Sequence, residues 1–109
     1  MVDYVTPKLP NKIIPVTRDC DRAITLRRKD EAGDPVDWDG QVSILIEQRG
    51  YPIQIDAVLD GPLATIRIEA QIANLTKTGT TWRIVWSQDG SPSFETPLMV
   101  GTFERNDGA

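Results

Sequence analysis

The feature that most constrains this chain is an alternation of apolar and polar residues, which runs from residue 23 onward between closely spaced turn residues. Trp82, Ile84 and Trp86, for example, occupy every second position of the segment 80–88. A period of two places such side chains on one face of a β-strand, whereas an amphipathic helix needs a period near 3.6. The pattern therefore predicts an all-β domain with this tryptophan-containing row in its core.

Six segments carry the alternation, and turn residues separate them. These segments are 23–29, 42–47, 53–59, 63–70, 80–88 and 94–105. Asp60-Gly61 predicts a tight hairpin of type I′. Counting one possible strand before residue 20, we predict a single immunoglobulin-like antiparallel β-sandwich of six to eight strands.

Two segments interrupt this pattern. Ile72 and Leu75 are three residues apart, which predicts one short helical turn where the chain crosses from one sheet to the other. Pro97 and Gly101 predict either an edge position or a bulge in the last strand.

A chain of 109 residues has the usual size of one domain and can bury a sufficient core without disulfides or metals. Its single cysteine, Cys20, cannot form an internal disulfide, and Asp19 and Asp21 beside it disfavour a reactive thiolate. The N-terminus lacks the apolar region of a signal peptide, and no segment approaches the roughly 20 apolar residues of a membrane span. We therefore expect a soluble protein made in a cytoplasm.

The first 16 residues differ from the rest of the sequence. Their three prolines exclude a central strand and favour an extended arm. The arm is rich in apolar residues, and its candidates for subunit contacts are Tyr4, Val5, Leu9, Lys12, Ile13 and Ile14. It either reaches a neighbouring subunit or lies along its own domain as an irregular edge strand. We expect an arm over 1–16, a sandwich over 17–105 that folds without it, and a short tail over 106–109.

Charge is distributed unevenly along the chain. Residues 1–29 carry seven basic and three acidic side chains, whereas the remaining residues carry five basic and thirteen acidic ones. This asymmetry suggests electrostatic docking between copies, or onto another acidic surface. Ordinary solvated surface charge is the alternative interpretation.

Residue types argue against catalysis. The chain has no histidine, which excludes Ser-His-Asp and Cys-His catalysis and the common zinc sites, and it has no Gly-rich phosphate loop. An acidic loop lacks the spacing of an EF-hand, so its carboxylates are better explained as turn and capping groups than as calcium ligands. The acidic residues of this loop are Asp30, Glu31, Asp34, Asp37 and Asp39. The acidic body also disfavours nucleic acid. We predict a protein that is not an enzyme and that has no cofactor or metal.

Two aromatic residues, Trp38 and Tyr51, lie at predicted loop edges rather than in a core row. Flat aromatic side chains at such positions can stack on sugars, so a carbohydrate-binding or adhesion module is the alternative function.

Three segments carry a resemblance to a known family: DEAGDPVDWDGQVSILIE (30–47), ANLTKTGTTWRIVWSQDG (73–90) and PLMVGTFER (97–105). Over about residues 17–105 the chain resembles the LtfC-like β-sandwich family of tailed-phage virion proteins, with N-terminal domains of upper baseplate proteins as looser relatives. It departs from the family pattern at Trp38, and the resemblance does not extend to the N-terminal arm.

The resemblance implies a non-enzymatic, multi-copy subunit of the virion, with other virion proteins and copies of itself as partners. A place in the tail (collar, baseplate or minor tail protein) and a place on the head (capsid decoration or minor capsid protein) both remain open. The resemblance carries over no catalytic residue.

Overall fold

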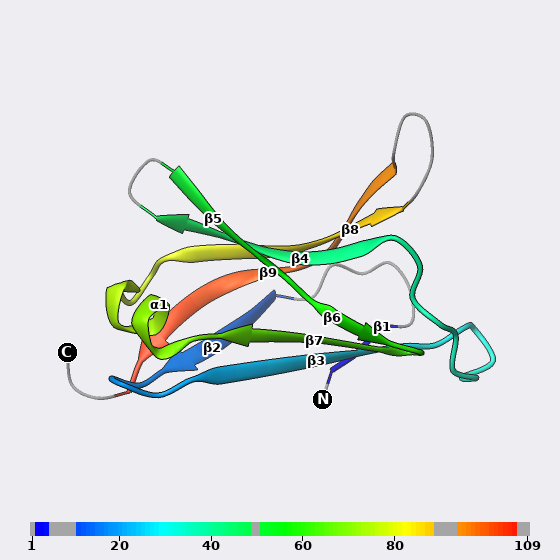
Figure 1. The fold of residues 1–109 in the computed structure, drawn as a ribbon, viewed down its shortest axis with the longest axis horizontal. Coiled ribbons are helices and arrows are strands. Elements are labelled where there is room, and N and C mark those ends of the chain that lie inside the picture. The colour runs from blue at the N-terminus through cyan, green and yellow to red at the C-terminus, as the bar shows by residue number, and fades with distance from the viewer. Residues whose placement is uncertain (1, 5–10, 49–50, 89–93, 107–109) are drawn as a thin grey trace.

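In the computed structural model of the protein, residues 2–4, 11–48, 51–88 and 94–106 are described, and these form two β-sheets packed face to face (Figure 1). One sheet has the strand order β1 (Val2–Tyr4), β3 (Arg22–Arg28), β7 (Leu63–Ile68), β6 (Val58–Asp60). The other has the order β2 (Asn11–Val16), β9 (Phe94–Arg105), β8 (Thr81–Gln88), β4 (Gln41–Gln48), β5 (Tyr51–Asp56). The predicted β-sandwich is confirmed.

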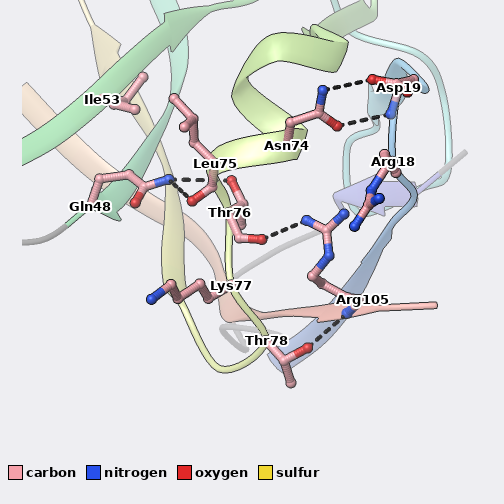
Figure 2. A pocket seen from close by; sticks show the side chains of 10 residues that line it. All are labelled: Arg18, Asp19, Gln48, Ile53, Asn74, Leu75, Thr76, Lys77, Thr78 and Arg105. Atoms are coloured by element: carbon pink, nitrogen blue, oxygen red, sulfur yellow. Dashed lines mark hydrogen bonds between the residues drawn. The ribbon is translucent and has the colours of Figure 1, made fainter. Parts of the chain in front are cut away.

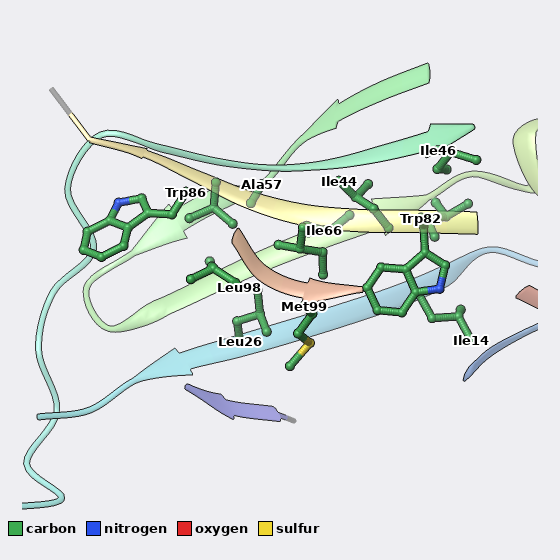
Figure 3. Close-up of a cluster of buried hydrophobic side chains, with 14 of the residues drawn as sticks. Ile14, Leu26, Ile44, Ile46, Ala57, Ile66, Trp82, Trp86, Leu98 and Met99 are labelled. Carbon is green, nitrogen blue, oxygen red and sulfur yellow. The ribbon is translucent and has the colours of Figure 1, made fainter. Parts of the chain in front are cut away.

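The core lies between the two sheets. Trp82, Ile84 and Trp86 of β8 are 3%, 0% and 6% exposed, which confirms the predicted row. Ile66 of β7 and Leu26 of β3 are fully buried within the same cluster, which Figure 3 shows between the layers. Removing these apolar surfaces from water is the main force that holds the sheets together.

The segment predicted as one strand over 53–59 is split between the two sheets. β5 ends at Asp56 in the five-stranded sheet, and β6 begins at Val58 in the four-stranded sheet. Ala57 between them is buried, and its N–H donates to the carbonyl of Val42 at 2.7 Å. Both sheets face the same core, so the alternation of apolar residues continues through the crossing and conceals it.

The chain crosses between sheets again at the helix α1 (Ala70–Leu75), where a helical turn was predicted. The described residues form nine strands rather than six to eight, because one predicted strand is divided and the N-terminal segment contributes two.

The hairpin between β6 and β7 is not of the predicted type I′. Its two loop residues are Gly61, with φ of +58°, and Pro62. Type I′ requires positive φ at both positions, and the proline ring fixes φ near −65°. Glycine followed by proline instead matches type II′, in which only the first residue has positive φ.

The N-terminal segment lies along its own domain, which is one of the two interpretations left open by the sequence. β2 pairs in parallel with β9, from Asn11 opposite Val100 to Val16 opposite Arg105. β1 pairs in parallel with β3. The body pairs antiparallel as predicted, so the two parallel pairings both come from this segment.

The sandwich therefore begins before residue 17. Ile14 and Val16 of β2 are 6% and 1% exposed and belong to the core. The last strand has the predicted bulge, since the register of β8 and β9 shifts between Ile84 and Val85. β2 covers β9 only from Val100 to Arg105, so Pro97 lies in the part of β9 that pairs with β8 alone among the described strands.

Candidate functional site

The exposed edge of β2 carries two of the predicted contact residues. Lys12 and Ile13 are exposed, and the side chain of Ile13 is 62% accessible. Ile14 is buried against the chain's own core, so it is not available to a neighbour while β2 is in place. Tyr4 lies in β1, opposite Arg28. Val5 and Leu9 lie outside the described residues.

A groove of about 250 Å³ runs beside β2, where the two sheets are open to solvent. Ile13 and Pro15 line it from β2, and Ile24 lines it from β3. The parallel pairing with β1 covers β3 only from Leu26 to Arg28, so the edge of β3 before Leu26 borders this groove. An extended segment could add to such an edge by main-chain hydrogen bonds.

Trp38 is not at the surface, contrary to its proposed role in stacking on a sugar. Its side chain is 7% exposed, and its ring meets that of Trp86 edge to face with a centroid separation of 5.2 Å. The guanidinium carbon of Arg28 lies 4.5 Å from the Trp86 ring centroid and 5.8 Å from that of Trp38. Trp38 is buried because its ring packs against the Trp86 ring and the Arg28 guanidinium at one end of the core. Tyr51 begins β5.

The acidic loop 30–39 has one carboxylate, that of Asp30, that acts as a turn group, and a second, that of Asp39, that pairs with Arg28. The Asp30 side chain accepts hydrogen bonds from the backbone N–H of Ala32 and Asp34, at 3.0 and 2.9 Å. Asp39 lies 3.4 Å from Arg28, which also donates to the Asp37 carbonyl at 2.7 Å. Within the part of the chain that the structure describes, no three carboxylate or thiol side chains are grouped to hold a metal ion.

A second pocket, of about 940 Å³, opens at the α1 end of the sandwich (Figure 2). Its basic side chains are Arg18, Lys77 and Arg105, and Asp19 is its acidic one. Leu75, 68% exposed, adds an apolar surface.

Hydrogen bonds fix the wall of this α1-end pocket. The Arg105 guanidinium donates to the carbonyls of Ala73 and Thr76, both at 2.8 Å, and so closes the end of α1. The Gln48 amide donates to the Leu75 carbonyl at 3.2 Å. Asn74 accepts from the backbone N–H of Asp19 at 2.8 Å, which ties α1 to the turn before β3.

Two carboxyl groups have shifted acidities. The pKa of Asp21 is lowered below its ordinary value, first because Arg67 donates a hydrogen bond to it and second because the backbone N–H of Ala70 does. The pKa of Asp56 is lowered by hydrogen bonds from Gln54 and Ser43. Both groups are at the surface and accept hydrogen bonds from neighbouring segments.

The α1-end pocket could not be predicted from the sequence. Its walls come from four segments that are far apart along the chain, around residues 18, 48, 75 and 105, so no motif marks it. Cys20 is a free, exposed thiol close to this end. Among the residues that the structure describes, no helix is long and apolar enough to span a membrane.

Comparison with known proteins identifies a family and a similar solved structure. The family model described as an LtfC-like β-sandwich domain matches residues 8–106. Among solved structures, the N-terminal domain of phage TP901-1 ORF48 superimposes with a TM-score of 0.63 over 95% of this chain and 94% of that chain, at 10% identity. At that identity the likeness shows a shared fold. No curated protein matches by sequence.

Proposed function

We propose that this chain, which belongs to the LtfC-like β-sandwich domain family, is a non-enzymatic structural subunit of a tailed-phage virion and is located in the tail. The observation that carries the proposal is the family match over residues 8–106, which takes in nearly all of the sandwich. The fold shared with a phage protein domain supports it. The surfaces through which such a subunit would contact its partners are the exposed strand edges, the groove beside β2 and the α1-end pocket.

Within this function, the exposed edge of β2 and the groove beside it are the proposed contact with another virion protein. The edge combines a free apolar side chain, Ile13, with a positive charge at Lys12. A partner strand that carries acidic and β-branched residues would suit both. Repeated copies of one weak contact add through multivalency, so each contact need not be strong.

The proposal is tested on virions of the phage whose genome encodes the chain. Mass spectrometry of purified particles should find the chain in several copies, and antibody labelling in electron micrographs should mark the tail. Absence from purified particles would overturn the virion assignment, whereas labelling of the head would overturn the tail assignment.

The β2 contact is tested by complementation, with variants supplied in trans to a phage that lacks the gene. Ile13→Asp with Lys12→Glu replaces an apolar and a basic side chain of the β2 edge by acidic ones, and both positions lie outside the core. This variant should be incorporated into virions in fewer copies than the wild type. Thr81→Glu with Arg83→Glu makes the same change of charge at two exposed positions of β8 and serves as the control. Equal incorporation of both folded variants would remove the β2 edge from the proposal.

A further inference from the structure

The groove beside β2 lies where the four-stranded sheet is incomplete. β1 pairs with β3 only from Leu26 onward, so among the described strands none lies on that side of β3 before Leu26. In Figure 1, β2 lies toward the start of β3 and β1 toward its end. The groove of about 250 Å³ is therefore open beside the first half of β3, with β2 across from it.

The edge of β3 along this groove can accept another strand. The N–H of Arg28 donates to the Pro62 carbonyl at 2.9 Å, in the direction of β7. Backbone groups alternate in direction along a strand, so those of Ile24 also face β7, whereas those of Ala23 and Thr25 face the open side. Neither of these two residues is a proline, so the edge keeps its hydrogen-bond donors.

The edge of β2 is protected against the same addition. The Val16 carbonyl accepts the N–H of Asn106, the residue that follows β9, at 3.1 Å. By the same alternation, the backbone of Pro15 points away from β9. Proline has no N–H and interrupts a ladder on that side. A strand that enters the groove is therefore expected to pair with β3 and to place side chains against β2.

The side chains in the middle of the groove are apolar. Ile14, Trp82 and Met99 are buried at its floor, and Ile24 is half-buried beside them. Figure 3 shows Ile14, Trp82 and Met99 next to one another at one side of the core. The groove is smaller than the roughly 300 Å³ at which ordinary ligand pockets begin, so it suits alternate side chains of an extended segment better than a drug-sized molecule.

Two basic side chains, Lys12 and Arg22, also line the groove. Lys12 is exposed and Arg22 is half-buried, and neither forms an ion pair with another described residue. No acidic residue lines the groove within the described part of the chain. Asp21, next to Arg22 in sequence, is held by Arg67 and by the backbone N–H of Ala70. The groove therefore has positive charge without a counter-charge of its own, which favours an acidic occupant.

We infer that the groove binds an extended segment of another protein, which pairs with β3 in line with β1 and carries acidic residues beside its apolar ones. The apolar side chains enter between the sheets, and the carboxylates reach Lys12 and Arg22. The inference rests on the proposed function, since it names the edge and the chemistry by which a neighbouring virion protein is held. It is tested on the purified chain, so its failure leaves the virion test unaffected, and absence from virions would leave peptide binding unaffected.

The test measures the binding of three capped seven-residue peptides to the purified full chain by fluorescence anisotropy. Each peptide has valines at two alternate positions, with glutamate before them, after them or on both sides. At least one should bind with a Kd below about 1 mM, and its affinity should fall as the salt concentration rises. In NMR spectra, binding should shift the backbone amide signals of Ala23 and Thr25 and the indole N–H signal of Trp82.

Two changes separate the main-chain contacts from the ionic ones. Methylating the backbone nitrogens of the tightest-binding peptide removes its donors while the protein stays unchanged, and should weaken binding by about tenfold or more. Lys12→Glu with Arg22→Glu reverses the charge of the groove and should also weaken binding by about tenfold or more. Lys77→Glu with Arg83→Glu reverses two exposed basic side chains outside the groove, so this control should bind like the wild type. Circular dichroism establishes that both variants are folded.

Three outcomes would overturn the inference: none of the three peptides binds, the methylated peptide binds as tightly as its parent, or the groove variant binds as tightly as the wild type. A purified chain that dimerised through the groove would also overturn it, because the occupant would then be a second copy.

Discussion

Asp21 joins three segments at the α1 end of the sandwich. It precedes β3, pairs with Arg67 of β7, and accepts the backbone N–H of Ala70 at 2.7 Å, the first residue of α1. Glu69, at the N-cap position, makes no capping hydrogen bond through its side chain, so Asp21 takes over that role from a distant part of the sequence.

The first prediction concerns the pH dependence of stability through Asp21. Its pKa in the folded protein is below the ordinary value of 3.8, so its contribution to stability is fully present above pH 3.8 and is lost as the pH falls through the lowered pKa. Asp21→Asn should therefore unfold at a lower temperature than the wild type at pH 7, and the difference should shrink below pH 3.8. Thermal melts between pH 2 and pH 7 measure this. A difference that grew toward low pH would contradict the assignment.

Gly101 is required by close packing rather than by its backbone angles. A Cβ atom built there would lie 1.8 Å from the carbonyl oxygen of Lys12 and 2.6 Å from the Trp82 ring. Glycine at this position lets β2 approach β9 while the Trp82 ring lies over the same residue.

The second prediction is that Gly101→Ala lowers the free energy of unfolding by about 3 kcal/mol or more, since backbone must move to admit the methyl group. Gly33→Ala is the control, because Gly33 has a φ of +86° and open space around it, so it tests backbone strain alone. We expect the control to cost about 1 kcal/mol. Urea titration measures both, and equal costs would mean that β2 does not lie against Gly101.

At the scale of elements, β2 has two faces with opposite roles. Ile14 faces the core and Ile13 faces solvent, as the period of two in a strand requires. A shift of one residue in the pairing with β9 would exchange them.

The third prediction uses this pair. Ile14→Ala should lower the free energy of unfolding by about 2–4 kcal/mol, whereas Ile13→Ala should change it by no more than about 0.5 kcal/mol. Chemical denaturation followed by tryptophan fluorescence compares them. Similar values for both variants would contradict the register of β2.

At the scale of the whole molecule, the two ends of the chain complete one sheet. β2 pairs with β9 across Ile14 and Phe103, which are far apart in sequence, and Phe103 is 1% exposed beneath this pairing. Sheets closed by such distant segments fold slowly, because the loop-closure entropy is lost before the contacts form.

The fourth prediction is that deleting residues 1–16 destabilises the sandwich rather than leaving it intact. The deletion removes Ile14 and Val16 from the core and leaves the edge of β9 unpaired, which favours aggregation. Deleting residues 1–10 keeps β2 and is the matched control, so it should be much milder. Thermal melts and light scattering distinguish the two, and equal stability would mean that β2 adds nothing to the fold.

The sequence by itself determined the layered β architecture, the core row at Trp82, Ile84 and Trp86 and the helical turn at the sheet crossing, and for the last strand it left an edge position and a bulge open. These features follow from the spacing of apolar residues along a short segment, or from a single proline or glycine. They therefore depend only on residues that are close together in the sequence. The residues also indicated correctly that the acidic loop serves as a turn, since Asp30 caps its own backbone.

Only the tertiary structure decided features that depend on contacts between distant segments. The apolar row over 53–59 is divided at Ala57 between β5 of one sheet and β6 of the other, and the sequence does not reveal this because both sheets face the same core. The tertiary structure placed Trp38 inside, because Arg28 and Trp86 converge on it from other strands. It also joined Arg105, α1 and Gln48 into one pocket, which no spacing along the chain encodes.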